Sequence, residues 1–187
     1  MPIDATEQIF RATDRELWVV TAADGERRGG LIATTVVQAS IVPEIPRVLV
    51  AIACQHHTRK CIEASGAFAL HLLDETQLDW VWRFGLETGR DVDKFCDLQI
   101  RSGNSGSPIL TDAVSWLDCR IENRMLTGDR TVYLAEVIDA ECRLAQPPFT
   151  VRQMLALAPP EKLQQLKAHR IADAARDADA IRDWREA

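Results

Sequence analysis

Two β-rich runs follow a short polar start of the chain. Residues 17–23 (LWVVTAA) end at Asp24-Gly25, a dipeptide typical of tight turns, and residues 29–42 (GGLIATTVVQASIV) form a second run rich in β-branched side chains. Together the two runs predict a β-hairpin. Before them, residues 4–15 carry acidic side chains near their start and predict a short helix that is capped by Asp4 and covers one end of the fold.

The pattern then alternates between strands and helices. Residues 47–54 (RVLVAIAC) form an apolar run typical of a buried strand, and strand character returns in residues 67–73 (AFALHLL). Two other stretches, residues 56–66 and 75–85, place their apolar side chains at helical spacing, and each ends at a glycine. The Gly-, Ser- and Asn-rich residues 101–108 predict a loop.

A long hairpin is predicted in the last third of the β-rich region. Residues 114–126 and 131–144 are two long β-like runs, and residues 127–130 (TGDR) form the turn between them. About six strands with two inserted helices and short turns favour an antiparallel barrel with helical caps over a doubly wound parallel sheet. The expected fold class is therefore mainly β with inserted helices.

The end of the chain is predicted to be a helix that begins at Pro159-Pro160-Glu161. Its weakly apolar stripe favours packing against a subunit surface over a strong coiled coil. We therefore divide the chain into a β domain, residues 1–158, and a C-terminal helical extension, residues 159–187. The stripe consists of Leu163, Leu166, Arg170, Ala174, Asp177, Ile181 and Trp184.

Charge and composition exclude some classes of binding partner. The 187 residues carry a formal net charge of −6, which gives no global positive field for a nucleic-acid backbone. No run of 18 apolar residues occurs and the start lacks a signal-peptide pattern, so we expect a cytoplasmic protein without membrane contact. Five scattered cysteines favour reduced, mostly buried thiols over a disulfide framework.

Two clusters of residues are candidates for binding chemistry. Thr34 and Thr35 are adjacent, and neighbouring side chains of a strand point to opposite faces, so both reach one site only if the strand ends or bulges there. His57, Thr58, Arg59 and Lys60 stand where a strand ends and a helix begins, which predicts a phosphate site made of helix amides, a hydroxyl and two cations. For each cluster a purely structural explanation stays open. Thr34 and Thr35 fit a strand simply because threonine favours strands, and the residues after His56 fit a solvated basic first turn of a helix.

Metal sites, hydrolase sites and the common nucleotide-binding motifs have weaker support in the sequence. Cys54, His56, His57 and Cys61 are all metal-ligand types, but they lack the two well-spaced pairs of structural zinc sites, and we expect no metal. The chain has no GxSxG elbow for a serine hydrolase, and no GxGxxG or GxxxxGK[ST] cradle for nucleotides.

The order of these motifs resembles the flavin reductase-like family of FMN-binding split β-barrels, which includes flavin reductase components of two-component monooxygenases, flavoredoxins and domains of diflavin proteins. The resemblance covers about residues 10–150. Its motifs here are Val19-Val20-Thr21-Ala22 with Asp24-Gly25, Gly30 to Ser40 with Pro43, Thr58, Ser65-Gly66-Ala67-Phe68, Asp93-Lys94-Phe95 and Gly128-Asp129-Arg130-Thr131.

The resemblance implies a flavin site at a subunit interface. The flavin ring would lie against the backbone of residues 33–39, and its phosphate near Thr34 or Thr35 and the turn at Thr58. FMN is the implied cofactor, with FAD as the alternative, and NAD(P)H is the implied co-substrate. The implied cofactor-binding residues are Ala33, Thr34, Thr35, Val36, Gln38, Ala39, Cys54, His57, Thr58, Lys60, Lys94 and Phe95.

Departures from the family pattern keep more than one function open. Many relatives have GDH at the hairpin turn, where the histidine is associated with nicotinamide; here Arg130 takes that place. The usual Asn after SGxF is His71. The resemblance therefore implies an NAD(P)H-dependent flavin reductase, with a flavoredoxin-like electron carrier and a non-catalytic FMN-binding module as alternatives. A homodimer is expected, with a monooxygenase or another redox protein as partner.

Overall fold

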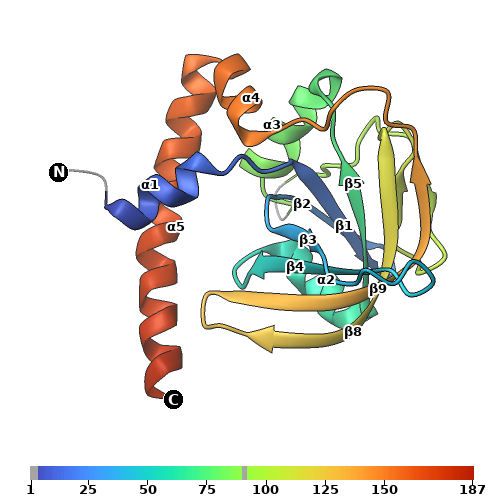
Figure 1. Cartoon of the computed structure of the whole chain (residues 1–187), viewed down its shortest axis with the longest axis horizontal. Coiled ribbons are helices and arrows are strands. Elements are labelled where there is room, and N and C mark those ends of the chain that lie inside the picture. Colours follow the sequence, from blue (N-terminus) through green and yellow to red (C-terminus); the bar gives the residue numbers. More distant parts are fainter. Residues whose placement is uncertain (1–3, 90–91) are drawn as a thin grey trace.

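A computed structural model describes residues 4–89 and 92–187 (Figure 1). The helices and strands follow the order α1 (Ala5–Ala12), β1 (Trp18–Asp24), β2 (Arg27–Ala33), β3 (Val36–Gln38), β4 (Arg47–Ala53), α2 (His57–Ser65), β5 (Ala67–Leu72), the 3₁₀ turn η1 (Glu75–Gln77), α3 (Leu78–Leu86), β6 (Ile100–Ser102), β7 (Pro108–Leu110), β8 (Ser115–Leu126), β9 (Arg130–Cys142), α4 (Val151–Leu157) and α5 (Pro160–Glu186).

A seven-stranded antiparallel sheet in the order β2-β1-β5-β8-β9-β4-β3 forms the body of the fold. Its two edge strands, β2 and β3, are consecutive in the chain, so the sheet curls into an incomplete barrel whose opening lies between them (Figure 1). The strand ends at Ala33 and resumes at Val36, so Thr34 and Thr35 lie at a strand interruption, which is the condition under which both side chains could reach one site. The predicted mainly β split barrel is confirmed.

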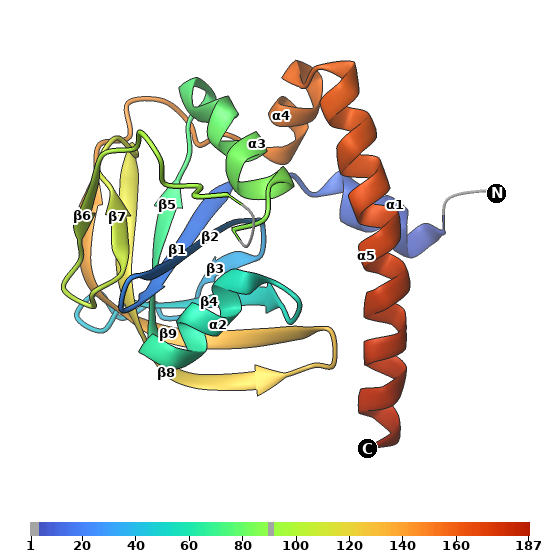
Figure 2. The ribbon, with the colours of Figure 1, turned by 180° about the vertical axis from the view of Figure 1, so that it is seen from behind.

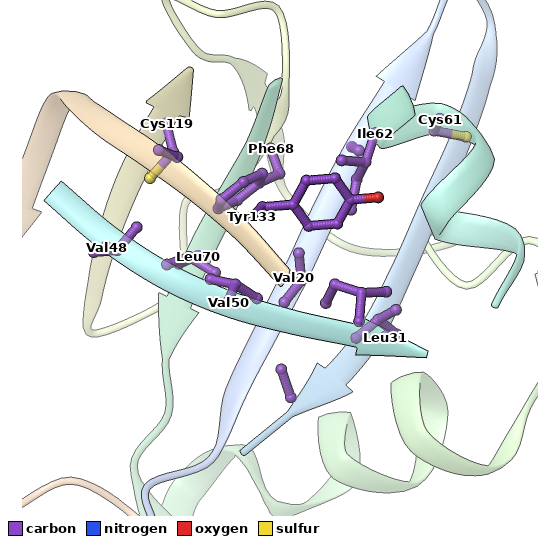
Figure 3. Packing of buried hydrophobic residues seen from close by; sticks show 14 residues of the cluster. Val20, Leu31, Val48, Val50, Cys61, Ile62, Phe68, Leu70, Cys119 and Tyr133 are labelled. Atoms are coloured by element: carbon purple, nitrogen blue, oxygen red, sulfur yellow. The ribbon is translucent and has the colours of Figure 1, made fainter. Parts of the chain in front are cut away.

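The inside of the curled sheet holds the larger apolar cluster (Figure 3). The rings of Phe68 and Tyr133 lie 6.4 Å apart between their centroids, and the Tyr133 hydroxyl donates a hydrogen bond of 2.6 Å to Glu63 of α2. Cys61 and Ile62 of the same helix are fully buried against this cluster. Helix α2 therefore closes one side of the barrel.

A second apolar cluster lies on the outer face of β1. Val19 belongs to it while its neighbour Val20 belongs to the inner cluster, as the two-residue period of a strand requires. Helices α3 and α4 cover this face through Val81, Phe84 and Met154.

A buried histidine joins the large sheet to the small sheet of β6 and β7. The His71 Nδ1–H donates to the Val19 carbonyl at 3.1 Å, and Nε2 accepts the Leu110 N–H at 3.0 Å. Complete burial lowers the pKa of His71 to about 4, and the ring is therefore neutral at pH 7.

Four details differ from the sequence-based expectation. Helix α1 covers no end of the barrel: Ile9 and Phe10 are about two-thirds exposed, and Asp4 makes no side-chain cap. Helix α3 runs past Gly85 to Leu86. The predicted loop contains the short β6–β7 hairpin, because three-residue strands give no periodic signal. Finally, the thiols of Cys96 and Cys142 are exposed, although all five cysteines are free.

Helix α5 begins at Pro160, as predicted, and stands beside the barrel against the tip of the β8–β9 hairpin (Figure 2). Its 27 residues are mostly exposed, and Asp177 is its buried residue. Within the described part of the chain, no helix combines the length and the apolar character needed to cross a membrane.

Candidate functional site

The first turn of α2 opens onto a cavity of about 730 Å³, which we call the α2–α5 cavity. Residues from four distant parts of the chain form its wall. A smaller hollow of about 390 Å³, lined by Phe95 and Arg28, shares Gly30, His57, Gly89 and Lys94 with it. The wall of the α2–α5 cavity consists of Gly30, residues 55–58, residues 85–89, Lys94, His169, Ala172, Asp173 and Arg176.

Two glycines of β2 allow helices to approach the strand closely. A Cβ atom on Gly29 would lie 2.7 Å from the Thr58 Cα atom, and one on Gly30 would lie 2.5 Å from the Phe84 ring. Thr58 is accordingly buried at the start of α2. Any side chain on these two glycines would push the first turn of α2 away from the sheet or displace the ring.

The first turn of α2 lies at the wall of the cavity. A helix leaves its first amide groups without helical partners, and the aligned peptide dipoles make this end partly positive. The N-cap residue, His56, makes no side-chain hydrogen bond to these amides. Since His57 and Thr58 line the cavity, this end of α2 is suited to an anion.

Lys94 places a buried cation at the wall of the cavity. Its Nζ atom donates to the Gly30 carbonyl at 3.1 Å and to the Phe84 carbonyl at 3.0 Å. Burial lowers the pKa of Lys94 to about 8, and the nearby Glu87 carboxylate opposes this effect. The amine therefore stays mostly protonated at pH 7, and it ties β2 to the end of α3.

Charged groups of α5 face His56 across the cavity. Burial is the main cause that lowers the pKa of His56; the cations Lys94, Arg130 and Arg176 lower it further, whereas the Asp173 carboxylate raises it. Asp173 and Arg176 also pair with each other at 3.0 Å. The cavity is thus bounded by the barrel on one side and by α5 on the other.

Comparison with known proteins identifies the family. The sequence profile described as "Flavin reductase like domain" matches residues 10–155. The chain belongs to the flavin reductase-like family. Helix α5 lies outside the matched part.

Relatives in the flavin reductase-like family differ in length. The chain is 30% identical over 136 residues to a "High molecular weight rubredoxin" of Moorella thermoacetica, and this match spans 72% of the chain and 58% of that relative. It is 29% identical over 127 residues to a "Ferric-chelate reductase (NAD(P)H)" of Archaeoglobus fulgidus, which spans 67% of the chain and 74% of that relative.

A solved structure with the same fold is the "NADH:FAD oxidoreductase SgcE6" of Streptomyces globisporus. The two chains superpose with a TM-score of 0.69 at 26% identity, over 80% of this chain and 90% of that chain.

The residues implied by the family resemblance fall into separate places. His57, Thr58 and Lys94 line the α2–α5 cavity, and Phe95 lines the adjoining hollow. Lys60 is exposed on α2 and is not part of the cavity wall.

Residues around the strand interruption lie away from the α2–α5 cavity. Ala33 is buried, Thr34 is half-buried and Thr35 is exposed, and none of them lines the α2–α5 cavity. Val36 and Gln38 line a different, mostly apolar hollow of about 490 Å³.

The apolar hollow also includes Trp18 and the loop that follows β3. The indole N–H of Trp18 is buried and has no hydrogen-bond partner within the described part of the structure. The Gln38 side chain donates to the Ser40 carbonyl at 2.7 Å, and Ala39 is exposed.

Arg130 is already engaged within the chain. It pairs with Asp129 at 3.3 Å and with Asp177 of α5 at 3.2 Å. The Cys54 N–H donates to the Asp129 carbonyl at 2.8 Å, and the Cys54 thiol to the Gly128 carbonyl at 3.6 Å. These contacts join the end of β4 to the hairpin turn beneath α5.

The candidate zinc ligands do not converge. The Cys61 thiol points to the Arg27 carbonyl of β2, at 3.9 Å, whereas Cys54 points to the hairpin turn. Across residues 4–89 and 92–187, no cluster of three or more His, Cys, Asp or Glu side chains is suited to a metal ion.

Sequence reasoning missed the α5 side of the cavity. His169, Ala172, Asp173 and Arg176 follow the i, i+3, i+4, i+7 spacing of one helical face, but this face is not apolar. Only the contact with a part of the chain more than 100 residues away reveals it. Glu87 was missed in the same way. Its carboxylate raises the pKa of Lys94, and this effect depends on the fold bringing the two side chains together.

Proposed function

We propose that the protein is an FMN-binding oxidoreductase of the flavin reductase type, with NAD(P)H as electron donor. One observation carries the proposal: in a member of this family, the uncapped start of α2, the buried Thr58 and the buried cation of Lys94 border one cavity. A phosphate group fits this combination of amides, hydroxyl and positive charge.

The barrel opening supports the placement of the flavin ring. Strands β2 and β3 are both sheet edges, so backbone groups near the interruption at Thr34 and Thr35 are available for hydrogen bonds. We propose that residues 33–39 hold the ring by such contacts. FMN, when bound, supplies the hydride and electron chemistry, and the chain's own residues bind and orient it.

A second candidate is an electron carrier with tightly bound FMN that exchanges electrons with a protein. The engagement of Arg130 by Asp129 and Asp177 favours it, because this side chain is not available for a nicotinamide nucleotide in the described arrangement. The similarity to a relative named as a rubredoxin supports it as well. In this case, a monooxygenase or another redox protein is the proposed partner.

We also propose a homodimer in the cytoplasm. Val37, Ile41, Val42 and Ile45 are large apolar side chains that are exposed around the apolar hollow beside β3. Such a patch is typical of a surface covered by another protein, and a second copy of this chain is the proposed occupant.

Purification followed by anaerobic titration tests these proposals. A colourless protein that oxidises NADH or NADPH only when FMN is added indicates a reductase. A yellow protein with one FMN per chain that neither nucleotide bleaches indicates a carrier. A protein that binds neither FMN nor FAD at micromolar concentration contradicts the proposed function.

A further inference from the structure

We propose that α5 closes the phosphate end of the flavin site, so that the site accepts FMN and excludes the dinucleotide FAD. This inference rests on the proposed function, and it names which flavin the site selects. It assigns a specificity role to a helix that lies outside the part of the chain matched by the family profile.

One face of α5 carries both the cavity wall and the anchor of the helix. His169, Ala172 and Arg176 line the α2–α5 cavity. The same face continues one and two turns later, where Asp177, Ala180, Ile181 and Trp184 meet the β8–β9 hairpin. The docking of α5 on the hairpin therefore helps to set the position of the wall, together with the Arg170–Glu7 pair at 3.0 Å and the packing of Leu166 against the second apolar cluster.

The anchor consists of a close backbone approach and a charge pair. Gly128 has a φ of +90°, and a Cβ atom there would lie 2.8 Å from the Ala180 carbonyl oxygen and 3.0 Å from the Ile181 Cα atom. Only a glycine satisfies both conditions. Two residues later, Arg130 pairs with Asp177, which is buried with only 8% of its surface exposed.

The position of this wall decides what lies beyond the phosphate. FAD differs from FMN by an adenylate group joined to the phosphate, so that group must continue outward from the start of α2. The α5 face that carries Ala172 and Asp173 borders the cavity there. Asp173 and Arg176 neutralise each other at 3.0 Å, so this wall offers no net charge to a second phosphate.

The test compares two charge reversals on the same helix. Asp177→Lys places a cation against Arg130 and loosens α5 from the hairpin. Asp179→Lys is the matched control: Asp179 is mostly exposed and pairs with Arg182 on α5 itself, at 2.7 Å. The dissociation constants of FMN, FAD and riboflavin are measured by titration calorimetry on the full-length chain.

We expect the wild type to bind FMN at least about tenfold more tightly than FAD, and Asp177→Lys to reduce this ratio at least about fivefold. Asp179→Lys should leave the ratio within about twofold. Arg130→Gln removes the same pair without adding charge and should shift the ratio in the same direction, which keeps the test decisive where Asp177→Lys fails to fold.

Two results would overturn the inference while the proposed function stands: equal affinity of the wild type for FMN and FAD, or an unchanged ratio in both anchor variants while hydrogen exchange shows α5 loosened. A wild type that binds no flavin would instead reject the proposed function itself.

Discussion

The curled sheet buries whole rows of side chains, whereas α5, the longest element, has Asp177 as its buried residue. Phe68 and Tyr133 are fully enclosed inside the barrel, but Trp184 near the end of α5 is about half exposed. The barrel is therefore held by apolar burial, whereas the helix is held mainly by a glycine contact and two ion pairs, Arg130–Asp177 and Arg170–Glu7, with Leu166 packed against the second apolar cluster. The difference means that α5 can change the site without changing the fold.

Removing one ring from each region should give the largest contrast. Phe68→Ala opens a cavity in the barrel and should lower the free energy of unfolding by about 3–5 kcal/mol. Trp184→Ala on α5 should cost about 1 kcal/mol or less, because its ring is only half covered. Urea denaturation at pH 7 measures both changes. Similar losses in the two variants would show that α5 is part of the cooperative core.

Acidification should weaken the barrel through His71. The folded pKa of about 4 lies below the ordinary 6.5, so below pH 6.5 the unfolded chain binds the proton first, and stability falls until the folded state also protonates. The expected contribution is a loss of about 1–2 kcal/mol between pH 7 and pH 5.

Urea denaturation of wild type and His71→Asn at both pH values isolates this contribution. The variant should be less stable at pH 7, because the contacts to Val19 and Leu110 are weakened, but its stability should depend less on pH. The same pH dependence in both proteins would show that another group titrates.

Lys94 should affect both stability and binding. Lys94→Met takes the donor from the Gly30 and Phe84 carbonyls and should lower the free energy of unfolding by about 1–3 kcal/mol, a loss that is reduced because burial disfavours the charged amine. The same substitution should weaken FMN binding about tenfold, because it removes the buried cation from the cavity wall. Lys60→Ala, outside the wall, is the control and should leave FMN affinity nearly unchanged. A large stability loss with intact FMN binding would make Lys94 a purely structural tether.

Local sequence signals predicted most of the barrel. The turn dipeptide Asp24-Gly25, the left-handed Gly66 after α2 and the long hairpin around Gly128 all lie where the pattern placed them. The β6–β7 hairpin escaped prediction, since its strands have only three residues each. Helix α1 was misplaced because its apolar residues indicate a helix but not what the helix packs against.

The candidate site was predictable only on its barrel side. Thr58 follows a strand and starts a helix, which is a local signal for anion binding. The opposite wall at Ala172 and Arg176 depends on how α5 docks, and nothing in the neighbouring sequence indicates that contact. For the same reason, the sequence does not show that Arg130, a candidate for binding a nicotinamide nucleotide, is paired with Asp177.

The most direct test asks whether the flavin phosphate binds at Thr58. FMN and riboflavin differ only in the phosphate, and Thr58→Val removes the hydroxyl while it keeps the shape that packs on Gly29. In the wild type, FMN should bind at least about tenfold more tightly than riboflavin, and Thr58→Val should remove most of this advantage while riboflavin affinity stays the same. An unchanged ratio of FMN to riboflavin affinity in the variant would contradict a phosphate site at the start of α2.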